Sequence, residues 1–182
     1  MLETMLMRYC SPTLGGLKTG SLFTCPFPGE QEILSALLHW NQLLRPKGLC
    51  LLPLRRHRGR TLIYVYRPAF LARDLSHPKV ETLLLQLGYP LPSAARCVAY
   101  LMSRLRSCES FPHEIGLFLG YPPADVQGFM EDPAACKYTG CWKVYENVNS
   151  ARALFAKYRA CAQYYHEQLS MGISLESLAA SG

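Results

Sequence analysis

A thiol, two hydroxyls, two glycines and a lysine lie close together near the N-terminus, in the segment Cys10–Lys18. We expect this segment to be a loop, because Pro12 and the glycine pair that follows it break a short helix predicted over residues 2–10. The backbone N–H groups of such a loop can hold an anion while the lysine supplies charge. A plain turn before a strand is the alternative, since the spacing of a phosphate-binding P-loop is absent. The residues predicted to bind a ligand here are Cys10, Ser11, Thr13 and Lys18.

A second group of candidate ligand-binding residues includes His113 and Glu114, which follow a proline at a predicted helix start. A histidine beside a carboxylate can be tuned as a general base. Neighbours on a helix do not face each other, however, and Glu114 at this position also complements the helix dipole. We expect Tyr121 and Trp142 to form walls of the same site. The sequence identifies no nucleophile, so no catalytic residue is assigned.

The segment Phe111–Phe129 resembles a helix-turn-helix, with two short helices predicted over Pro112–Leu119 and Pro123–Met130. Gly116 is small enough for the helices to approach closely, and Gly120 makes the turn between them. The second helix bears acidic and amide side chains and no Lys or Arg, so it would bring carboxylates toward phosphates. We therefore interpret the segment as a structural helical hairpin, and recognition of nucleic acid by this helix is the alternative.

Positive charge is concentrated in the first part of the chain. Residues 1–75 contain ten Lys and Arg against four Asp and Glu, and the remainder contains nine of each, so the net charge of +6 arises before residue 76. A dense run of basic residues, such as the one at residues 55–60, can attract nucleic acid or another anion. The alternative is that these residues form an ordinary turn exposed to water. The residues of this candidate patch are Arg55, Arg56, Arg58 and Arg60.

The chain is cysteine-rich, with eight cysteines. Cys50, Cys97 and Cys161 fall in apolar periodic segments, where a free thiol behaves as a small hydrophobic side chain. The spacings of the remaining cysteines and histidines are looser than those of a typical structural zinc site. We assign no metal and no cofactor, and the candidate ligands for a metal would be Cys108, His113, Cys136 and Cys141.

Length and composition predict a globular protein with one core. The chain has 182 residues, of which 49% are hydrophobic and 18% charged, and this composition excludes disorder for most of it. We expect a single domain over residues 1–172 and a loosely ordered tail over residues 173–182. Uninterrupted apolar runs of ~18 residues, as needed to cross a membrane, are absent. The N-terminus lacks a signal-peptide pattern, so we expect a cytoplasmic protein, and its many thiols suit a reducing, anaerobic cytoplasm.

Periodicity and helix-stop signals predict the main elements. Apolar residues recur at helical spacing over Glu30–Arg45, Val80–Leu87 and Ser150–Met171, and Ser93 is a predicted N-cap of a further helix. The tetrapeptide Leu-Gly-Tyr-Pro occurs twice, at residues 87–90 and 119–122, and each copy predicts the end of a helix.

Short apolar runs predict the strands. Leu49–Leu54 and Thr61–Arg67 form a predicted β-hairpin with the basic cluster at its tip, and Pro53 places the first of these strands at an edge or distorts it near its end. Further extended runs are predicted over Lys18–Thr24 and Cys141–Tyr145. The expected fold is α+β, a helix-rich single domain around a small mixed or antiparallel sheet, containing the helix-turn-helix-like hairpin.

Four parts of the chain together resemble one known family. They are Cys10–Leu14 with Lys18, Leu22 and Phe23, then Phe111–Phe129, Gly140–Tyr145, and the helix that carries Phe155, Tyr158, Cys161 and Tyr165. These segments are similar to domain of unknown function 3793, an uncharacterised bacterial family found mainly in anaerobic Firmicutes. The resemblance implies a bacterial, cytoplasmic, stand-alone domain, and it implies no catalytic residue, substrate or cofactor.

These observations predict a protein that binds a small anionic or redox-active ligand through its Cys- and His-containing loops. One alternative is a regulator that binds nucleic acid through the helix-turn-helix-like hairpin and the Arg55–Arg60 tip. The other alternative is an accessory or scaffold protein without enzymatic activity.

Overall fold

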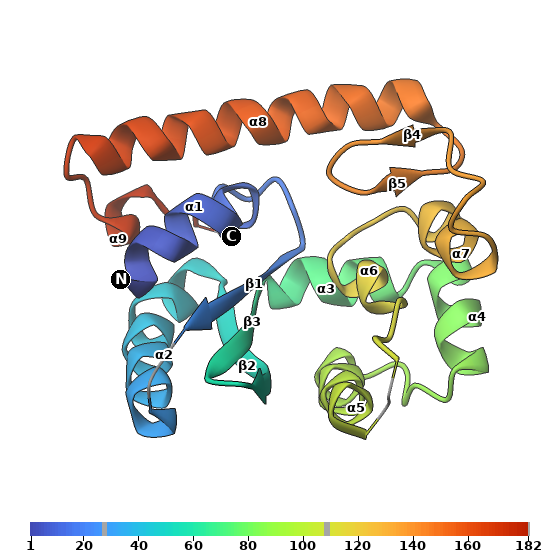
Figure 1. Cartoon of the computed structure of the whole chain (residues 1–182), viewed down its shortest axis with the longest axis horizontal. Helices are drawn as coiled ribbons and strands as arrows, with labels where there is room; N and C mark the ends of the chain where they lie inside the picture. The colour runs from blue at the N-terminus through green and yellow to red at the C-terminus, as the bar shows by residue number, and fades with distance from the viewer. Residues whose placement is uncertain (27–28, 108–109, 182) are drawn as a thin grey trace. The chain divides into compact units, whose positions relative to one another are not determined.

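The structure is a computed structural model, and it describes residues 1–26, 29–107 and 110–181. It is helix-rich, with a three-stranded and a two-stranded antiparallel sheet, which confirms the predicted α+β class (Figure 1). The chain forms two compact units, Met1–Phe70 with Ala160–Gly182, and Leu71–Arg159. In the described part of the chain, every helix is too short or too polar to cross a bilayer.

The sheet of the first unit consists of β1 (Gly20–Pro26), β2 (Cys50–His57) and β3 (Arg60–Tyr66) in the order β1-β3-β2. β2 and β3 form the predicted hairpin, and β2 is an edge strand as the proline predicts. The pairing of β2 shifts register between Pro53 and Arg55. A bulge at this place accommodates a residue that has no N–H to donate to the ladder.

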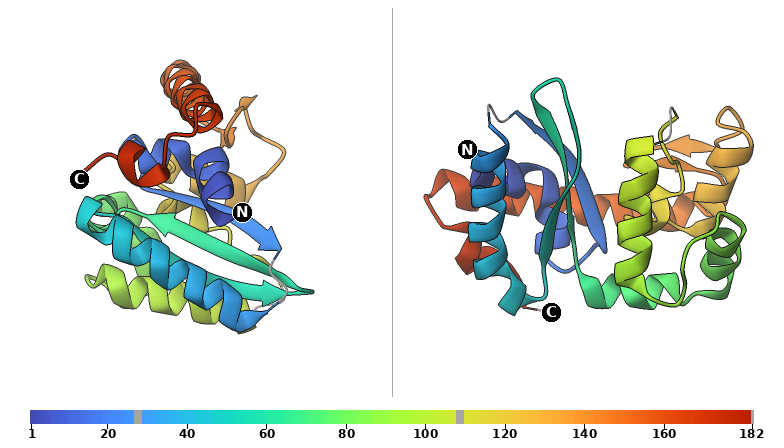
Figure 2. Two further views of the ribbon diagram at one scale, coloured as in Figure 1. Left: turned by 90° about the vertical axis from the view of Figure 1, so that its left-hand side faces the viewer. Right: turned by 90° about the horizontal axis from the view of Figure 1, so that it is seen from below.

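Helices cover one face of this sheet. α1 (Leu2–Leu14) and α2 (Glu30–Leu44) pack on it directly, and the short 3-10 helix η1 (Arg45–Lys47) follows α2 (Figures 1 and 2). The C-terminal part of α8 (Val148–Ser170) and α9 (Leu175–Leu178) pack against α1. Ile63 and Val65 of β3 share a core with Phe23 of β1 and with apolar side chains of these helices. Each fully buried aliphatic side chain of this kind stabilises a fold by roughly 1.5–3 kcal/mol. The helical partners include Leu6, Met7, Leu14, Ile33, Leu37, Tyr165 and Leu175.

Helix α1 extends further than the sequence predicts. We expected a loop from Ser11 onward, but the helix continues through Pro12 to Leu14. Met7, Cys10 and Leu14 lie on one helical face and are fully or almost fully buried. Burial of this face outweighs the hydrogen bond that a proline inside a helix removes.

The C-terminal segment, which we expected to be loosely held over residues 173–182, includes α9 and contacts the first unit. Leu175 and Ala179 are buried in the core of the first unit. The Lys47 ammonium donates hydrogen bonds to the carbonyl oxygens of Glu176 and Ala179, the latter at 3.0 Å. These contacts fix α9 to η1, which follows α2.

Arg67 directly follows β3 and is one of the most buried side chains, with 1% of its surface exposed. Its guanidinium donates to the carbonyl oxygens of Thr13 and Leu14, both at 2.8 Å, of Lys47 at 3.2 Å and of Ala180 at 2.8 Å. Two of these carbonyls belong to the C-terminal end of α1, where the helix dipole favours a cation. A single side chain therefore joins α1, η1 and the C-terminal segment.

The second unit contains most of the remaining helices. They are α3 (Pro68–Leu75), which begins at the end of the first unit, α4 (Pro78–Gln86), α5 (Ala94–Ser107), α6 (Ile115–Phe118), α7 (Pro123–Glu131) and the first part of α8. β4 (Tyr138–Thr139) and β5 (Lys143–Val144) form a small hairpin. The Ser93 hydroxyl accepts the N–H of Arg96, which confirms the predicted N-cap of α5.

Both copies of the Leu-Gly-Tyr-Pro tetrapeptide end a helix in the same way. Gly88 and Gly120 have φ angles of 78° and 77°. In each copy, the tyrosine N–H bonds to the carbonyl five residues earlier, at 3.0 Å, and the glycine N–H bonds to the carbonyl three residues earlier. This is the Schellman arrangement, which glycine favours because it adopts a positive φ without strain.

Replacing Arg67 by methionine is expected to destabilise the first unit, because four carbonyls lose their donor. Hydrogen bonds to a charged group contribute about 1.5–3 kcal/mol each, so we expect the free energy of unfolding to fall by about 3 kcal/mol or more. Urea denaturation measures this loss. The exposed Arg73→Met serves as the control, and equal stability of the two variants would contradict the role given to Arg67.

Stability should fall at alkaline pH, because burial raises the pKa of six tyrosines. The values for Tyr121 and Tyr165 are raised to about 12, and those of Tyr66, Tyr89, Tyr145 and Tyr158 are also raised. The unfolded chain releases these protons near pH 10 while the folded chain retains them, so stability is full below about pH 10 and is lost as pH rises toward about 12. Urea denaturation at a series of pH values tests this. Tyr121→Phe should make the decline shallower, and the exposed Tyr164→Phe should leave it unchanged.

Candidate functional site

A cavity of about 270 Å³ lies in the second unit, between α6, α7 and the β4–β5 hairpin. Its walls are largely aromatic and aliphatic, with a few polar groups. This is the usual composition of a small-molecule site. The lining residues are His113, Ile115, Gly116, Tyr121, Asp125, Val126, Phe129, Cys141, Trp142 and Lys143.

Asp125 organises this cavity. It is the third residue of α7, where a negative charge complements the helix dipole. Its side chain is buried, with one carboxylate oxygen accepting the Trp142 indole N–H at 2.8 Å and the other accepting the Tyr145 backbone N–H at 2.7 Å. The carboxylate therefore joins α7 to the strand β5 and fixes the orientation of Trp142.

Trp142 and Tyr121 form one wall. Their rings stack with centroids 4.5 Å apart and an interplanar angle of 24°. Phe155 of α8 packs against Trp142 edge to face, with centroids also 4.5 Å apart. Burial raises the pKa of Tyr121 to about 12, and the Cys141 thiol adds to this effect. The hydroxyl therefore remains protonated at neutral pH.

Phe129 is a third aromatic residue of the lining, and both His113 and Lys143 contact its ring. The His113 ring meets it edge to face, with centroids 4.9 Å apart. The Lys143 ammonium lies 5.6 Å from the centroid of Phe129 and donates to the Pro133 carbonyl oxygen at 2.8 Å. An imidazole and an ammonium therefore lie beside Phe129, and His113 is exposed.

The close approach of α6 and α7 depends on a glycine. A Cβ atom on Gly116 would lie 2.8 Å from a methyl carbon of Val126 and 3.1 Å from the Tyr121 ring. Both distances are shorter than an ordinary carbon contact. The small residue therefore brings the two helices together, as the helix-turn-helix-like pattern predicts.

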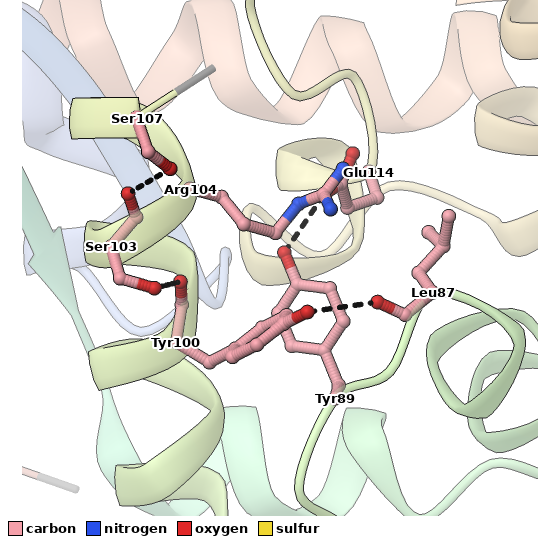
Figure 3. Close-up of polar contacts among 7 residues, drawn as sticks. All are labelled: Leu87, Tyr89, Tyr100, Ser103, Arg104, Ser107 and Glu114. Atoms are coloured by element: carbon pink, nitrogen blue, oxygen red, sulfur yellow. Dashed lines mark hydrogen bonds and ion pairs between the residues drawn. The ribbon is translucent and has the colours of Figure 1, made fainter.

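Glu114 belongs to a different cluster from His113, although the two are adjacent in sequence. Its carboxylate is buried and accepts hydrogen bonds from Arg104 Nε at 2.7 Å and from the Tyr89 hydroxyl at 2.9 Å (Figure 3). The pKa of Tyr89 is raised by burial and by the charge and hydrogen bond of Glu114. Glu114 therefore links α5 to α6, and the cavity lining does not include it.

The first part of the predicted N-terminal loop, Cys10–Leu14, belongs to helix α1. Cys10, Ser11 and Thr13 are fully buried. The Ser11 hydroxyl donates to the Met7 carbonyl oxygen, and the hydroxyls of Thr13 and Ser21 bond to each other at 2.9 Å. Burial raises the pKa of the Cys10 thiol, so it lacks the thiolate character of a reactive cysteine. Lys18, the remaining predicted residue, is partly buried between α1 and β1.

The candidate metal ligands do not form a cluster in the described ranges. Cys108 lies outside the described residues. His113 and Cys141 both line the cavity, and Cys136 is absent from its lining. Among residues 1–26, 29–107 and 110–181 as a whole, the cavity included, no group of three or more metal-ligating side chains occurs.

The basic residues Arg55, Arg56, Arg58 and Arg60 lie where the sequence predicts, at the tip of the β2–β3 hairpin in the first unit. All four are exposed. They are not part of the cavity lining, which comes entirely from the second unit.

Sequence reasoning anticipated His113, Tyr121 and Trp142 as site residues but did not assign Asp125, Phe129 or Lys143 to the site. Val126 and Phe129 are marked by the packing pattern of the helix-turn-helix-like segment. Asp125 has the signal of an acidic residue in a helix first turn, which by itself indicates only a favourable dipole interaction.

Replacing Asp125 by asparagine is expected to loosen Trp142. The side-chain NH2 of asparagine is itself a donor, so it would face the N–H of either Trp142 or Tyr145 and leave that group without an acceptor. Leaving a buried donor unsatisfied costs about 1–3 kcal/mol. In a Trp40→Phe background, where Trp142 is the remaining tryptophan, we expect lower stability and a red-shifted emission. The exposed Glu146→Gln is the control. An unchanged fluorescence emission spectrum and an unchanged midpoint of urea denaturation in the Asp125 variant would show that the carboxylate is dispensable.

Comparison with known proteins places the chain in a family. No curated protein and no solved structure matches it significantly. The family model described as "Protein of unknown function (DUF3793)" matches residues 6–179, which is nearly the whole chain. The chain therefore belongs to the DUF3793 family.

Proposed function

We propose that the cavity between α6, α7 and the β4–β5 hairpin binds a small ligand with a planar apolar ring and an anionic group. The observation that carries this proposal is the combination of a stacked Tyr121–Trp142 wall with two basic side chains in one lining. The lining composition supports binding, and no reaction is proposed.

The size of the cavity limits the ligand. Its volume of about 270 Å³ is near the lower end of small-molecule sites, which run from roughly 300 to 1,000 Å³. A compound with one or two rings fits such a volume. The rings of Tyr121, Phe129 and Trp142 can contact it by stacking or edge-to-face packing.

The charge of the lining favours an anion. Both Asp125 oxygens accept hydrogen bonds from the protein itself, so this negative charge is already solvated within the fold. An ammonium has three N–H donors, and the structure assigns one donor of Lys143 to Pro133. Lys143 therefore retains the capacity to bind a carboxylate or phosphate, with the exposed His113 nearby along Phe129.

The sequence predicts either an anionic or a redox-active ligand, and the number of thiols in the cavity lining helps to choose between them. Cys141 contributes the one thiol found among the described lining residues. Dithiol exchange needs a pair of cysteines, so the lining favours reversible binding of an anion over thiol-based electron transfer.

A charge series tests the proposal in the Trp40→Phe background, with Trp142 emission as the reporter. Benzoate, benzyl alcohol and benzylamine share one ring and differ in charge. We expect saturable quenching that is tightest for benzoate and weakest for the protonated amine. The absence of saturable quenching by all three compounds at about 10 mM, above the millimolar range accessible to a single-ring fragment, would reject the proposal.

A matched pair of variants tests the role of charge. Lys143→Met should weaken benzoate binding and leave benzyl alcohol binding nearly unchanged, while Lys157→Met on the exposed side of α8 should change neither. Equal effects of the two variants on benzoate would indicate attraction by net charge rather than by the cavity.

A further inference from the structure

We propose that the tip of the β2–β3 hairpin contacts the phosphate backbone of double-stranded nucleic acid without sequence preference. The hairpin tip is defined here as residues 55–60, Arg-Arg-His-Arg-Gly-Arg. It belongs to the first unit, whereas the cavity belongs to the second, so the two proposals are independent.

The turn of the hairpin holds an arginine in a conformation that arginine seldom adopts. Arg58 and Gly59 connect the paired residues His57 and Arg60, and their φ angles are 48° and 71°. Two positive φ values in a two-residue loop indicate a type I′ turn, which favours Asn, Asp or Gly at its first position. Arg58 is the one non-glycine residue with a positive φ in the described part of the chain.

This conformational cost is informative. A left-handed residue with a Cβ costs about 1–2 kcal/mol relative to the right-handed region, and asparagine would reduce the cost. A residue that is unfavourable for the turn yet adds positive charge at its apex points to a function for that charge.

The strand register places three basic side chains on one face. Arg55 pairs with Leu62, and His57 pairs with Arg60. Because side chains alternate along a strand and paired residues share a face, Arg55, His57 and Arg60 point to the same side. Arg56 lies on the opposite face, 4.0 Å from Glu30.

The hairpin tip lies at the end of the sheet and is accessible. All its residues are exposed, and Figure 2 displays the β2–β3 turn at the free end of the strands. Among the described residues, the ion pair at the tip involves Arg56, whereas Arg55, Arg58 and Arg60 have none. The guanidinium groups of Arg55, Arg58 and Arg60 are thus exposed to solvent and not neutralised by a carboxylate of the described residues.

The chemistry of the tip favours a duplex phosphate backbone. Guanidinium groups bind phosphate oxygens in a bidentate manner, and duplex DNA carries one charge per ≈ 1.7 Å along its axis. Proteins that bind single strands combine basic groups with aromatic rings on which bases stack, and residues 55–60 include no Phe, Tyr or Trp. His57 is the one aromatic ring of the tip, beside four arginines, so the tip has more groups for the backbone than for base stacking.

Fluorescence anisotropy with a labelled mixed-sequence DNA duplex of about 30 base pairs tests the proposal on the full chain. Three phosphate contacts predict a slope of about −2.7 for log affinity against log salt, or about 40-fold weaker binding at 200 mM than at 50 mM salt. No binding at about 50 mM salt would overturn the proposal.

Two triple variants with the same net charge separate the tip from general attraction. Arg55→Gln with Arg58→Asn and Arg60→Gln should abolish salt-dependent binding. The matched control, Lys137→Gln with Lys157→Gln and Arg159→Gln, should bind within about twofold of the unchanged protein. Equal losses in both would overturn the proposal, as would tighter binding to single-stranded DNA or to phosphatidylglycerol vesicles than to the duplex.

Arg58→Asn alone provides a control for folding. Asparagine suits the type I′ turn, so this variant should be at least as stable as the unchanged protein in urea and should bind the duplex more weakly, with a shallower salt slope. Unchanged binding by this stable variant would exclude Arg58 from the contact.

Discussion

The Asp125 carboxylate accepts N–H groups from Trp142 and from the Tyr145 backbone, and these two bonds hold the β4–β5 hairpin against α7. Strands of two residues each bury too little surface to be stable alone. Their position depends on this carboxylate and on the packing of Trp142 with Tyr121 and Phe155. The aromatic wall of the cavity therefore results from one charged side chain whose hydrogen bonds remain within the protein.

The two Leu-Gly-Tyr-Pro segments show how one local motif serves two different environments. Each fixes the end of a helix by the same pair of backbone hydrogen bonds. The tyrosine that follows is then directed to different partners, since Tyr89 donates to the buried Glu114 and Tyr121 stacks on Trp142. The motif determines where the chain turns, and the surrounding side chains determine what the tyrosine does.

Local signals were sufficient to predict α2, the β2–β3 hairpin, its edge strand and both helix stops, because each depends on residues near in sequence. The path of α1 through Pro12 depends on burial of Met7, Cys10 and Leu14 by distant elements, so local rules placed a loop there. Of the candidate site, His113, Tyr121 and Trp142 were anticipated from residue type. Asp125 was not assigned to it, because its partners lie 17 and 20 residues further along the chain.

Arg67 also has a consequence for the order of events during synthesis. Its guanidinium bonds to carbonyls at Thr13, Leu14 and Lys47, which emerge from the ribosome before it, and to Ala180, which emerges more than one hundred residues later. Until that last segment arrives, α9 and Tyr165 are also missing from the core. Completion of the first unit must therefore wait until the segment from Ala160 to Ala180 has been made, by which point all of residues 71–159 have already emerged.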